Sequence, residues 1–548
     1  MKKISIYDTT LRDGTQAEEI SLSTGDKIRI ARKLNALGVD YIEGGWPGSN
    51  ETDRAFFTEI RQYDLSHSKV AAFGSTCSPR CSAHEDPNLA ALIAAAPDAA
   101  TLFGKTWDLH VTEALRVSHE ENLELIRSSI AHMGANVPEV FFDAEHFFDG
   151  YKANPDYAVA CLKAAHEAGA QVLVLCDTNG GCLPYEVRGI VAAVRDALPG
   201  DASLGIHTHN DSETAVANTV EAVHGGAVQV QGTINGYGER CGNANLCSII
   251  PNLELKSNGA YRCLPDGGLR KLTATSQFVS EICNLRPFTR QPFVGKSAFA
   301  HKGGIHVSAV LKNPQTYEHI PPETVGNEQR VLLSDLSGRS NILFMAKKYG
   351  YELDKNDSAV LDLLAEVKNR ENMGYEYSTA EASFELMFFQ AMGWSKRYFQ
   401  LVRFNVVGSM RPEYSAPYAE ATVMLKVGGT VEHTAATGQG QVNALDSALR
   451  KALVPFYPNL NEMRLVDFKV RVLPGSQNDS DGTASVVRVL IESADTTDRW
   501  TTVGVHYDLI HASWQALVDS INYKLFKDDP KKFPVGGKHF PAAPASGE

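Results

Sequence analysis

The sequence lacks any apolar run long enough to cross a membrane. Its most apolar stretch, residues 89–96, is rich in alanine and is followed by Pro97, so it falls well short of the roughly 18 residues that a membrane-spanning helix needs. No apolar segment typical of a signal peptide follows Met1. We therefore expect a soluble protein that is not secreted and has no membrane partner.

Cysteine and positive charge are also in short supply. The nine cysteines are an odd number scattered over 548 residues, which does not form a disulfide framework and fits a reducing compartment, so we expect a cytoplasmic protein. The 52 Lys and Arg against 65 Asp and Glu give a formal charge of −13. This excess of negative charge offers no general attraction to nucleic acid or to an anionic membrane. An anionic substrate must find local positive charge.

The composition is otherwise typical of several folded domains. Hydrophobic residues make up 43% of the chain, enough to bury sizeable cores, and the length exceeds one ordinary domain of about 150 residues. Residues 531–548, which end in a Pro- and Ala-rich run, are predicted to be a flexible tail.

The first half of the chain alternates short β-branched or aromatic runs with longer helical patterns. This alternation predicts a (β/α)₈ TIM barrel over residues 1–270, and an open doubly wound sheet is the structural alternative. Polar residues stand at the ends of the predicted strands and would converge only if the sheet closes. The predicted strands are 4–10, 39–46, 69–75, 100–105, 139–147, 171–178, 203–210 and 227–238.

The second half changes character twice. Residues 271–395 read as a mainly helical linker that contains a Gly- and His-rich loop at 301–306. Residues 396–530 read as an α+β domain in which a β-β-β-α pattern occurs twice. The predicted strands there are 398–407, 419–427, 429–435, 465–472, 484–491 and 500–506, and the predicted helices are 441–453 and 508–525.

The strongest candidate for a metal site follows the seventh predicted strand. His207 and His209 are two residues apart, so on a strand both imidazoles point to the same face, although such a pair also occurs in ordinary hydrogen bonding. Asp13, after the first predicted strand, would lie across the barrel mouth. Two imidazoles and one carboxylate suit Mn²⁺, Co²⁺, Fe²⁺ or Zn²⁺, and Mg²⁺ if waters complete an octahedron.

Charged residues at other strand ends are candidates for the chemistry. Arg12 either forms a simple ion pair with Asp13 or stabilises an oxyanion that develops beside a metal. Glu145 ends the fifth predicted strand, and it either satisfies a neighbouring group or pairs with His306 as an acid–base dyad. Tyr317 is a proton donor or a core residue.

Two weaker motifs carry no assignment. The Gly-rich run 232–245 lacks the ending of a Walker loop, so it gives no evidence for a nucleoside triphosphate. Cys77 and Cys81 have a spacing reminiscent of zinc sites but no second ligand pair, which favours incidental thiols.

Several motifs together resemble a known family over nearly the whole chain. Residues 8–16, 207–211, 235–245 and 301–306 resemble the 2-isopropylmalate, homocitrate and citramalate synthases. Within that family, residues 43–50, 103–111 and 142–150 are similar to one branch of citramalate synthases.

The resemblance implies a metal-dependent Claisen-type condensation. Acetyl-CoA adds through its methyl carbon to the keto carbon of pyruvate, and thioester hydrolysis yields (R)-citramalate and CoA on a route to isoleucine through 2-oxobutanoate. It also implies a homodimer and a C-terminal domain that binds isoleucine as feedback effector, with a dimerisation module that binds no ligand as the alternative.

The resemblance also assigns roles to residues. The metal would be held by Asp13, His207 and His209, with Asn243 as a further ligand or a group behind the ligands, and Arg12 would stabilise the oxyanion. Proton transfer would fall to Glu145, His306 and Tyr317. Substrate binding would involve Thr178 at the keto-acid carboxylate, together with Glu43 and the bulk of Trp46 and Lys105.

Three other functions stay open on the sequence. A 2-isopropylmalate or homocitrate synthase would use a larger keto acid, but the 2-isopropylmalate synthases have Phe-Pro where this chain has Trp46-Pro47. A 3-hydroxy-3-methylglutaryl-CoA lyase with the same barrel would use a cysteine where Cys241 lies. A catalytically silent amino-acid sensor would keep the barrel only as a scaffold.

Overall fold

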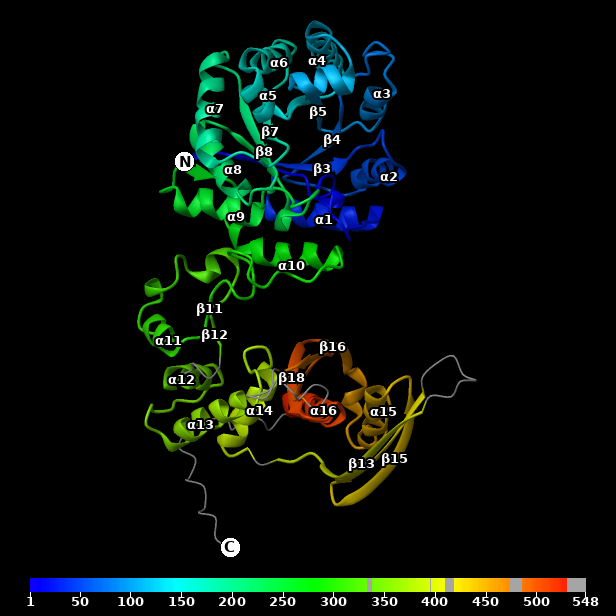
Figure 1. Cartoon of the computed structure of the whole chain (residues 1–548), viewed down its shortest axis with the longest axis vertical. Coiled ribbons are helices and arrows are strands. Elements are labelled where there is room, and N and C mark those ends of the chain that lie inside the picture. Colours follow the sequence, from blue (N-terminus) through cyan, green and yellow to red (C-terminus); the bar gives the residue numbers. More distant parts are fainter. Residues whose placement is uncertain (333–337, 395, 410–417, 474–484, 530–548) are drawn as a thin grey trace. The chain divides into compact units, whose positions relative to one another are not determined.

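The computed structural model describes residues 1–332, 338–394, 396–409, 418–473 and 485–529 (Figure 1). Contacts divide the chain into two compact units: Met1–Phe299 with Ile320–Gln329, and Ala300–His319 with the described residues from Arg330 onward. The predicted tail, 531–548, lies outside the described residues. In the part of the chain that is described, no helix is long and apolar enough to cross a membrane.

The first unit contains a closed barrel of eight parallel strands, which confirms the predicted (β/α)₈ fold. The closing pair is the first strand on the eighth, with Ser5 opposite Gln229 and Asp8 opposite Gly232. An open doubly wound sheet has no such pair, so that alternative is excluded. The strands are β2 (Ser5–Asp8), β3 (Tyr41–Gly45), β4 (Lys69–Ser75), β5 (Ala99–Lys105), β6 (Glu139–Glu145), β7 (Val172–Asp177), β8 (Leu204–Thr208) and β9 (Gln229–Gly232).

Helices connect the strands and bury their apolar faces against the outside of the barrel. The first of them begins at Ser23, whose hydroxyl accepts from the Asp26 N–H in a capping box, and ends at Gly38, whose φ of +100° a side chain would disfavour. The helices are α1 (Thr24–Leu37), α2 (Glu51–Glu59), α3 (Pro87–Ala94), α4 (His119–Gly134), α5 (Phe147–Ala153), α6 (Pro155–Glu167), α7 (Pro184–Ala197), α8 (Ala215–Gly225), α9 (Leu246–Pro251) and α10 (Leu272–Ile282).

The inside of the barrel is apolar at one end and polar at the other. Tyr7, Ala71, Ala99 and Phe141 form a small buried cluster of their own within the strands. Because alternate residues of a strand share one face, the residues two and four positions further along face the same interior. Thr101, Asp143 and Glu145 occupy such positions, so polar groups gather toward the carboxyl ends of the strands, and Phe73 and Phe103 add aromatic rings there.

The predicted eighth strand is too long. β9 stops at Gly232, and Ile234–Gly236 forms a 3-10 turn in which Asn235 has a φ of +65°. Residues 233–238 therefore belong to the loop above the barrel and not to its wall.

The second unit confirms the two predicted β-β-β-α copies. Each copy is a three-stranded antiparallel sheet followed by a helix. The first is β13 (Gln400–Ser409), β14 (Tyr418–Val427), β15 (Thr430–Gly438) and α15 (Gln441–Leu453). The second is β16 (Arg464–Val472), β17 (Val487–Ala494), β18 (Arg499–His506) and α16 (Leu509–Lys527), and residue 484 of the predicted strand 484–491 lies outside the described residues.

The predicted linker is helical but is shared between the units. α10 packs against α1 in the first unit. The helices α12 (Arg339–Lys348), α13 (Ser358–Asn372) and α14 (Glu381–Ala391) share one core with the C-terminal sheets, as the rings of Phe389 and Phe526 show at 4.7 Å. The boundaries at 270 and 395 stay predictions.

Candidate active site

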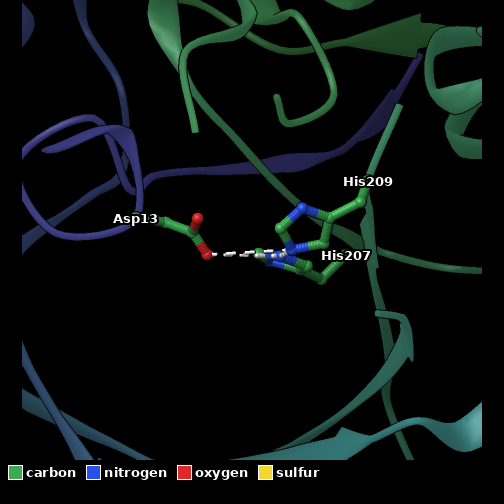
Figure 2. Close-up of side chains that lie close together, drawn as sticks. All are labelled: Asp13, His207 and His209. Atoms are coloured by element: carbon green, nitrogen blue, oxygen red, sulfur yellow. Dashed lines mark hydrogen bonds and ion pairs between the residues drawn. The ribbon is translucent and has the colours of Figure 1, made fainter. Parts of the chain in front are cut away.

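Asp13, His207 and His209 converge at the carboxyl ends of the barrel strands. The His207 and His209 Nε2 atoms lie 3.3 Å apart, and they lie 3.7 and 4.0 Å from the Asp13 Oδ2 atom (Figure 2). All three side chains are buried. Among the described residues, this is the one group of three or more such side chains close enough to hold a metal ion.

The protonation of these side chains fits a metal. His207 Nδ1 lies 3.0 Å from the Gln231 carbonyl Oε1, so Nδ1 carries the proton and Nε2 presents a lone pair. Burial lowers the pKa of His207, and it lowers the pKa of His209 to about 4. Burial by itself would raise the pKa of Asp13, but Arg12 and the two histidines outweigh it and bring that pKa to about 2. The site therefore offers two neutral imidazoles and one carboxylate.

Asn243 lies beside this group. Its Nδ2 donates to Asp13 Oδ1 over 2.8 Å, and its Oδ1 is buried with no hydrogen-bond partner among the described residues. Gly242, with a φ of +94°, turns the loop so that Asn243 faces His209 across an isolated bridge. An unsatisfied buried oxygen at this place is consistent with a further metal ligand.

Two polar residues lie behind His207: Gln231, which was not predicted, and Asp143, a polar strand-end residue to which no role was assigned. Gln231 is the cross-strand neighbour of His207, and its Nε2 donates to Asp143 Oδ1 over 3.0 Å. Burial, and after it the negative charge of nearby Glu43, raises the pKa of Asp143 to about 8. The signal that could have revealed them is the alternation along the strands, since Asp143 stands two residues before Glu145 and Gln231 opposite His207.

Arg12 contacts two carboxylates and an aromatic ring. Its Nη1 lies 3.0 Å from Asp13 Oδ2, its Nε donates to Glu43 Oε2 over 2.6 Å, and its guanidinium stacks 3.7 Å from the ring centre of Phe73. Burial lowers the pKa of Arg12, but Glu43 and Asp13 together raise it above its ordinary value. The predicted ion pair with Asp13 is present, and it also fixes a positive charge beside the metal-binding group.

Glu43 is predicted to bind substrate, but protein groups surround it. Its side chain is fully buried, Oε1 accepts from the Tyr7 hydroxyl over 2.7 Å, and Oε2 accepts from Arg12 and from the Thr9 hydroxyl. The register of β3 shifts between Glu43 and Gly45, where Gly45 has a φ of +143°. The structure therefore makes Glu43 a partner of Arg12.

Glu145 and Lys105 form an ion pair across neighbouring strands. Their side chains are 23% and 20% exposed, so both face the mouth. Thr178 lies on the next strand end, where its Oγ1 accepts from the His146 backbone N–H over 2.9 Å. Since that hydroxyl already accepts one bond, its own proton is available for a substrate oxygen.

Trp46 belongs to an aromatic wall that we define as Trp46, Phe73 and Phe103. The Phe73 and Phe103 rings stack at 5.2 Å, and the Trp46 indole meets both edge-on at 5.9 and 5.6 Å. Trp46 Nε1 donates to Asn88 Oδ1 over 2.6 Å, which fixes the indole. Phe73 and Phe103 were not predicted as site residues, although both occupy inward positions of predicted strands.

His306 and Tyr317 lie in the second unit. Their rings stack at 4.3 Å with an interplanar angle of 28°, and Tyr317 is 47% exposed, so it is not a core residue. Glu145 lies in the first unit. The predicted pairing of Glu145 with His306 therefore stays a prediction.

The cysteines form no disulfide. All nine are free, with Cys77 buried, Cys81 half-buried and Cys241 exposed. Cys81 Sγ lies 3.6 Å from an Asp86 carboxylate oxygen, which a thiolate would avoid. The motif of Cys77 and Cys81 is consistent with the predicted incidental thiols.

Comparison with known proteins matches the whole architecture. The HMGL-like family model matches residues 3–279, the model of the homocitrate synthase post-HMGL domain 293–374, and the model of the LeuA allosteric (dimerisation) domain 378–525. A curated (R)-citramalate synthase of Geobacter sulfurreducens is 58% identical over 96% of this chain and 99% of its own length. The chain belongs to the citramalate synthase family. This confirms the family resemblance in the sequence motifs.

Further relatives show a wide range of sequence identity. The (R)-citramalate synthase of Aquifex aeolicus is 52% identical over 96% of this chain and 99% of its own length. A 2-isopropylmalate synthase of Photorhabdus laumondii is 30% identical over 95% of both chains. A putative (R)-citramalate synthase of Methanopyrus kandleri, at 32% identity over 95% of this chain, is about as distant as the 2-isopropylmalate synthase.

Proposed function

We propose that the protein is a citramalate synthase: an acyltransferase that condenses acetyl-CoA with pyruvate and hydrolyses the thioester to (R)-citramalate and CoA. The observation that supports this most directly is the convergence of Asp13, His207 and His209 beside Arg12, in a chain 58% identical to a named (R)-citramalate synthase. A 2-keto acid has two adjacent oxygen groups that suit such a cation site.

The metal-binding residues have a defined task. Asp13, His207 and His209 would hold the cation, with Asn243 Oδ1 as a further ligand. Bound there, a divalent cation would polarise the keto group and neutralise the charge that develops on its oxygen. Mn²⁺, Co²⁺, Zn²⁺ and Mg²⁺ all match these donors.

The remaining charged residues handle the carboxylate and the protons. The Thr178 hydroxyl donates a hydrogen bond to the keto-acid carboxylate, and Arg12 stabilises negative oxygen in the transition state. Glu145, oriented by Lys105, accepts a proton from the acetyl methyl group, so that the methyl carbon attacks the keto carbon. His306 and Tyr317 return a proton to the alkoxide, and water then cleaves the thioester.

An assay of free thiol separates this function from its rivals. We expect thiol release from acetyl-CoA with pyruvate, no release after treatment with a chelator, and recovery when metal is restored. Preference for 2-ketoisovalerate would instead indicate a 2-isopropylmalate synthase, and cleavage of 3-hydroxy-3-methylglutaryl-CoA would indicate a lyase that uses Cys241. No turnover with any of these would favour the silent sensor.

The aromatic wall is expected to limit the keto acid to a methyl substituent. Phe103→Ala removes a ring that stacks on Phe73 and whose centre lies 5.6 Å from Lys105 Nζ, while it keeps the Phe73 ring on which Arg12 stacks. Because one methylene is worth about 1–3 kcal/mol in a pocket, we expect the ratio of kcat/KM for 2-oxobutanoate to that for pyruvate to rise by about 10- to 200-fold. Phe57→Ala, which truncates a ring buried outside the barrel site, is the matched control. Equal ratios in the two variants would contradict this role.

We also propose that isoleucine binds the C-terminal domain of a homodimer and inhibits the enzyme. The match to the LeuA allosteric (dimerisation) domain supports a regulatory module. Isoleucine is expected to lower the condensation rate and to raise the melting temperature, because a ligand stabilises the state it binds. Leucine is the control ligand, and an equal response to both would contradict the assignment. The full chain is required, since α14 packs against α16.

The free cysteine thiols support a proposal for the cellular compartment. Nine free cysteines, most of them buried, suit a reducing environment, and we place the reaction in the cytoplasm.

A further inference from the structure

A buried hydrogen bond closes the segment that carries His306 and Tyr317. The segment begins on β11 (Ala300–His301), passes through α11 (Gly304–Val310) and η7 (Pro314–Thr316), and ends at Glu318. His301 Nε2 lies 3.0 Å from Glu318 Oε1. The two side chains are only 10% and 3% exposed, so water contributes little to their solvation. We call this interaction the His301–Glu318 brace.

The start of the segment is fixed to its own unit. His301 pairs with Val331 on β12 (Arg330–Val331), and its carbonyl accepts from the Leu332 N–H over 2.8 Å. The next carbonyl, that of Lys302, accepts from the amide of Asn341, which is fully buried in α12. His301 is therefore attached to a rigid frame.

At the end of the segment, the brace adds a buried side-chain contact to a backbone turn. The Tyr317 and Glu318 N–H groups both donate to the Pro314 carbonyl, over 3.1 and 2.9 Å, which makes a tight turn. Because Tyr317 and Glu318 are adjacent in this turn, holding the Glu318 carboxylate also holds the Tyr317 backbone.

The rings of His306 and Tyr317 lie on the side of the segment opposite the His301–Glu318 brace. Val307 and Val310 of α11 are buried, while Ile305 is 82% exposed and Tyr317 47% exposed. The stack of His306 on Tyr317 joins α11 to the turn at the surface, and the brace joins the same two ends beneath it. A shift of about 1 Å between the ends would separate the rings, and catalytic geometry tolerates about 0.5 Å.

We propose that His301 and Glu318 are positioning residues that hold His306 and Tyr317 in catalytic register. This inference rests on the proposed roles of His306 and Tyr317 in proton transfer. Because both side chains are buried, we expect neither of them to contact the substrate. They act by fixing the distance between the helix that carries His306 and the turn that carries Tyr317.

The first test is a split between kcat and KM. His301→Ala is expected to lower kcat by about 10- to 100-fold, the usual effect of removing a group that orients an active residue, with KM for pyruvate and bound metal within about twofold of wild type. His301→Gln keeps an N–H donor toward Glu318 and is expected to recover most of the loss. A merely structural role would show no such recovery, or would change KM and kcat together.

A matched control separates positioning from stability. Ser383→Ala removes another buried side-chain bond of the same unit, that to Asp519 over 2.7 Å. Its melting temperature should fall with kcat unchanged. If Ser383→Ala lowered kcat as much as His301→Ala does, the loss would be one of stability and the proposal would be overturned.

The decisive measurement combines variants. If the brace acts through His306, then His301→Ala adds less than about twofold to the loss already caused by His306→Ala, because coupled residues are not additive. If the loss in the double variant equals the product of the two single losses, the positioning role is overturned, while the proposed role of His306 stays intact. Full activity of His306→Ala and of Tyr317→Phe would overturn the proposed roles of these rings, and the positioning role with them.

Discussion

The His207→Ala variant is expected to lose about a thousandfold or more in kcat, because cation stabilisation of the developing charge is worth several kcal/mol. His207 Nε2 lies within 3.7 Å of Asp13 Oδ2 and 3.3 Å of His209 Nε2. Removing the imidazole leaves the Asp13 carboxylate, the His209 nitrogen and the neutral Asn243 oxygen, a weaker set of donors that should no longer bind the cation tightly. Metal content after gel filtration, measured by mass spectrometry, should fall in parallel with the thiol-release rate.

Two comparisons make this result specific. His224→Ala removes a surface histidine of α8 that pairs with Glu221, and it should leave metal content and kcat unchanged. Gln231→Leu removes the acceptor that fixes the His207 proton on Nδ1, and metal affinity should fall by about 10- to 100-fold. Undiminished metal content in His207→Ala would contradict the proposed site.

The barrel and its metal-binding group could be predicted because both depend on local periodicity. Alternation of strands and helices sets the fold, and a two-residue spacing on a strand sets a common face for His207 and His209. If the sheet closes into a barrel, Asp13 after the first strand lies across the barrel mouth from the two histidines, so its position could be predicted as well. Each of these steps uses only the order of residues along the chain.

The contacts of the residues behind the site depend on the register between neighbouring strands, which the sequence does not reveal. His207 meets Gln231 because β8 and β9 pair at that one offset, and a shift by a single residue would turn Gln231 out of the barrel. Glu43 reaches Arg12 on a strand whose register shifts at Gly45. The packing of Phe389 on Phe526 likewise joins elements more than a hundred residues apart, so the shared core of the second unit was not predicted.

Arg12→Lys is expected to lower kcat by about 100- to 1,000-fold although the charge is kept, because loss of one preorganised donor at an oxyanion has this effect. A lysine cannot contact Asp13 and Glu43 with a planar fork and also stack on Phe73. Arg188→Lys, at an exposed ion pair with Glu221, is the control and should be neutral. A kcat within about threefold of wild type for Arg12→Lys would contradict a role for Arg12 beyond its charge.

The Arg12→Lys variant also tests whether Glu43 binds the substrate, as the sequence predicts, or serves as a partner of Arg12, as its hydrogen bonds indicate. Both Glu43 oxygens accept from protein donors, so we expect Glu43 to affect the reaction only through Arg12. Glu43→Gln should therefore cost little further activity once Arg12 is lysine, because the two changes break one interaction. If Glu43 instead bound the substrate, the two losses would multiply and KM for pyruvate would rise with Glu43→Gln alone. The double variant and both single variants, compared in kcat and KM, separate these cases.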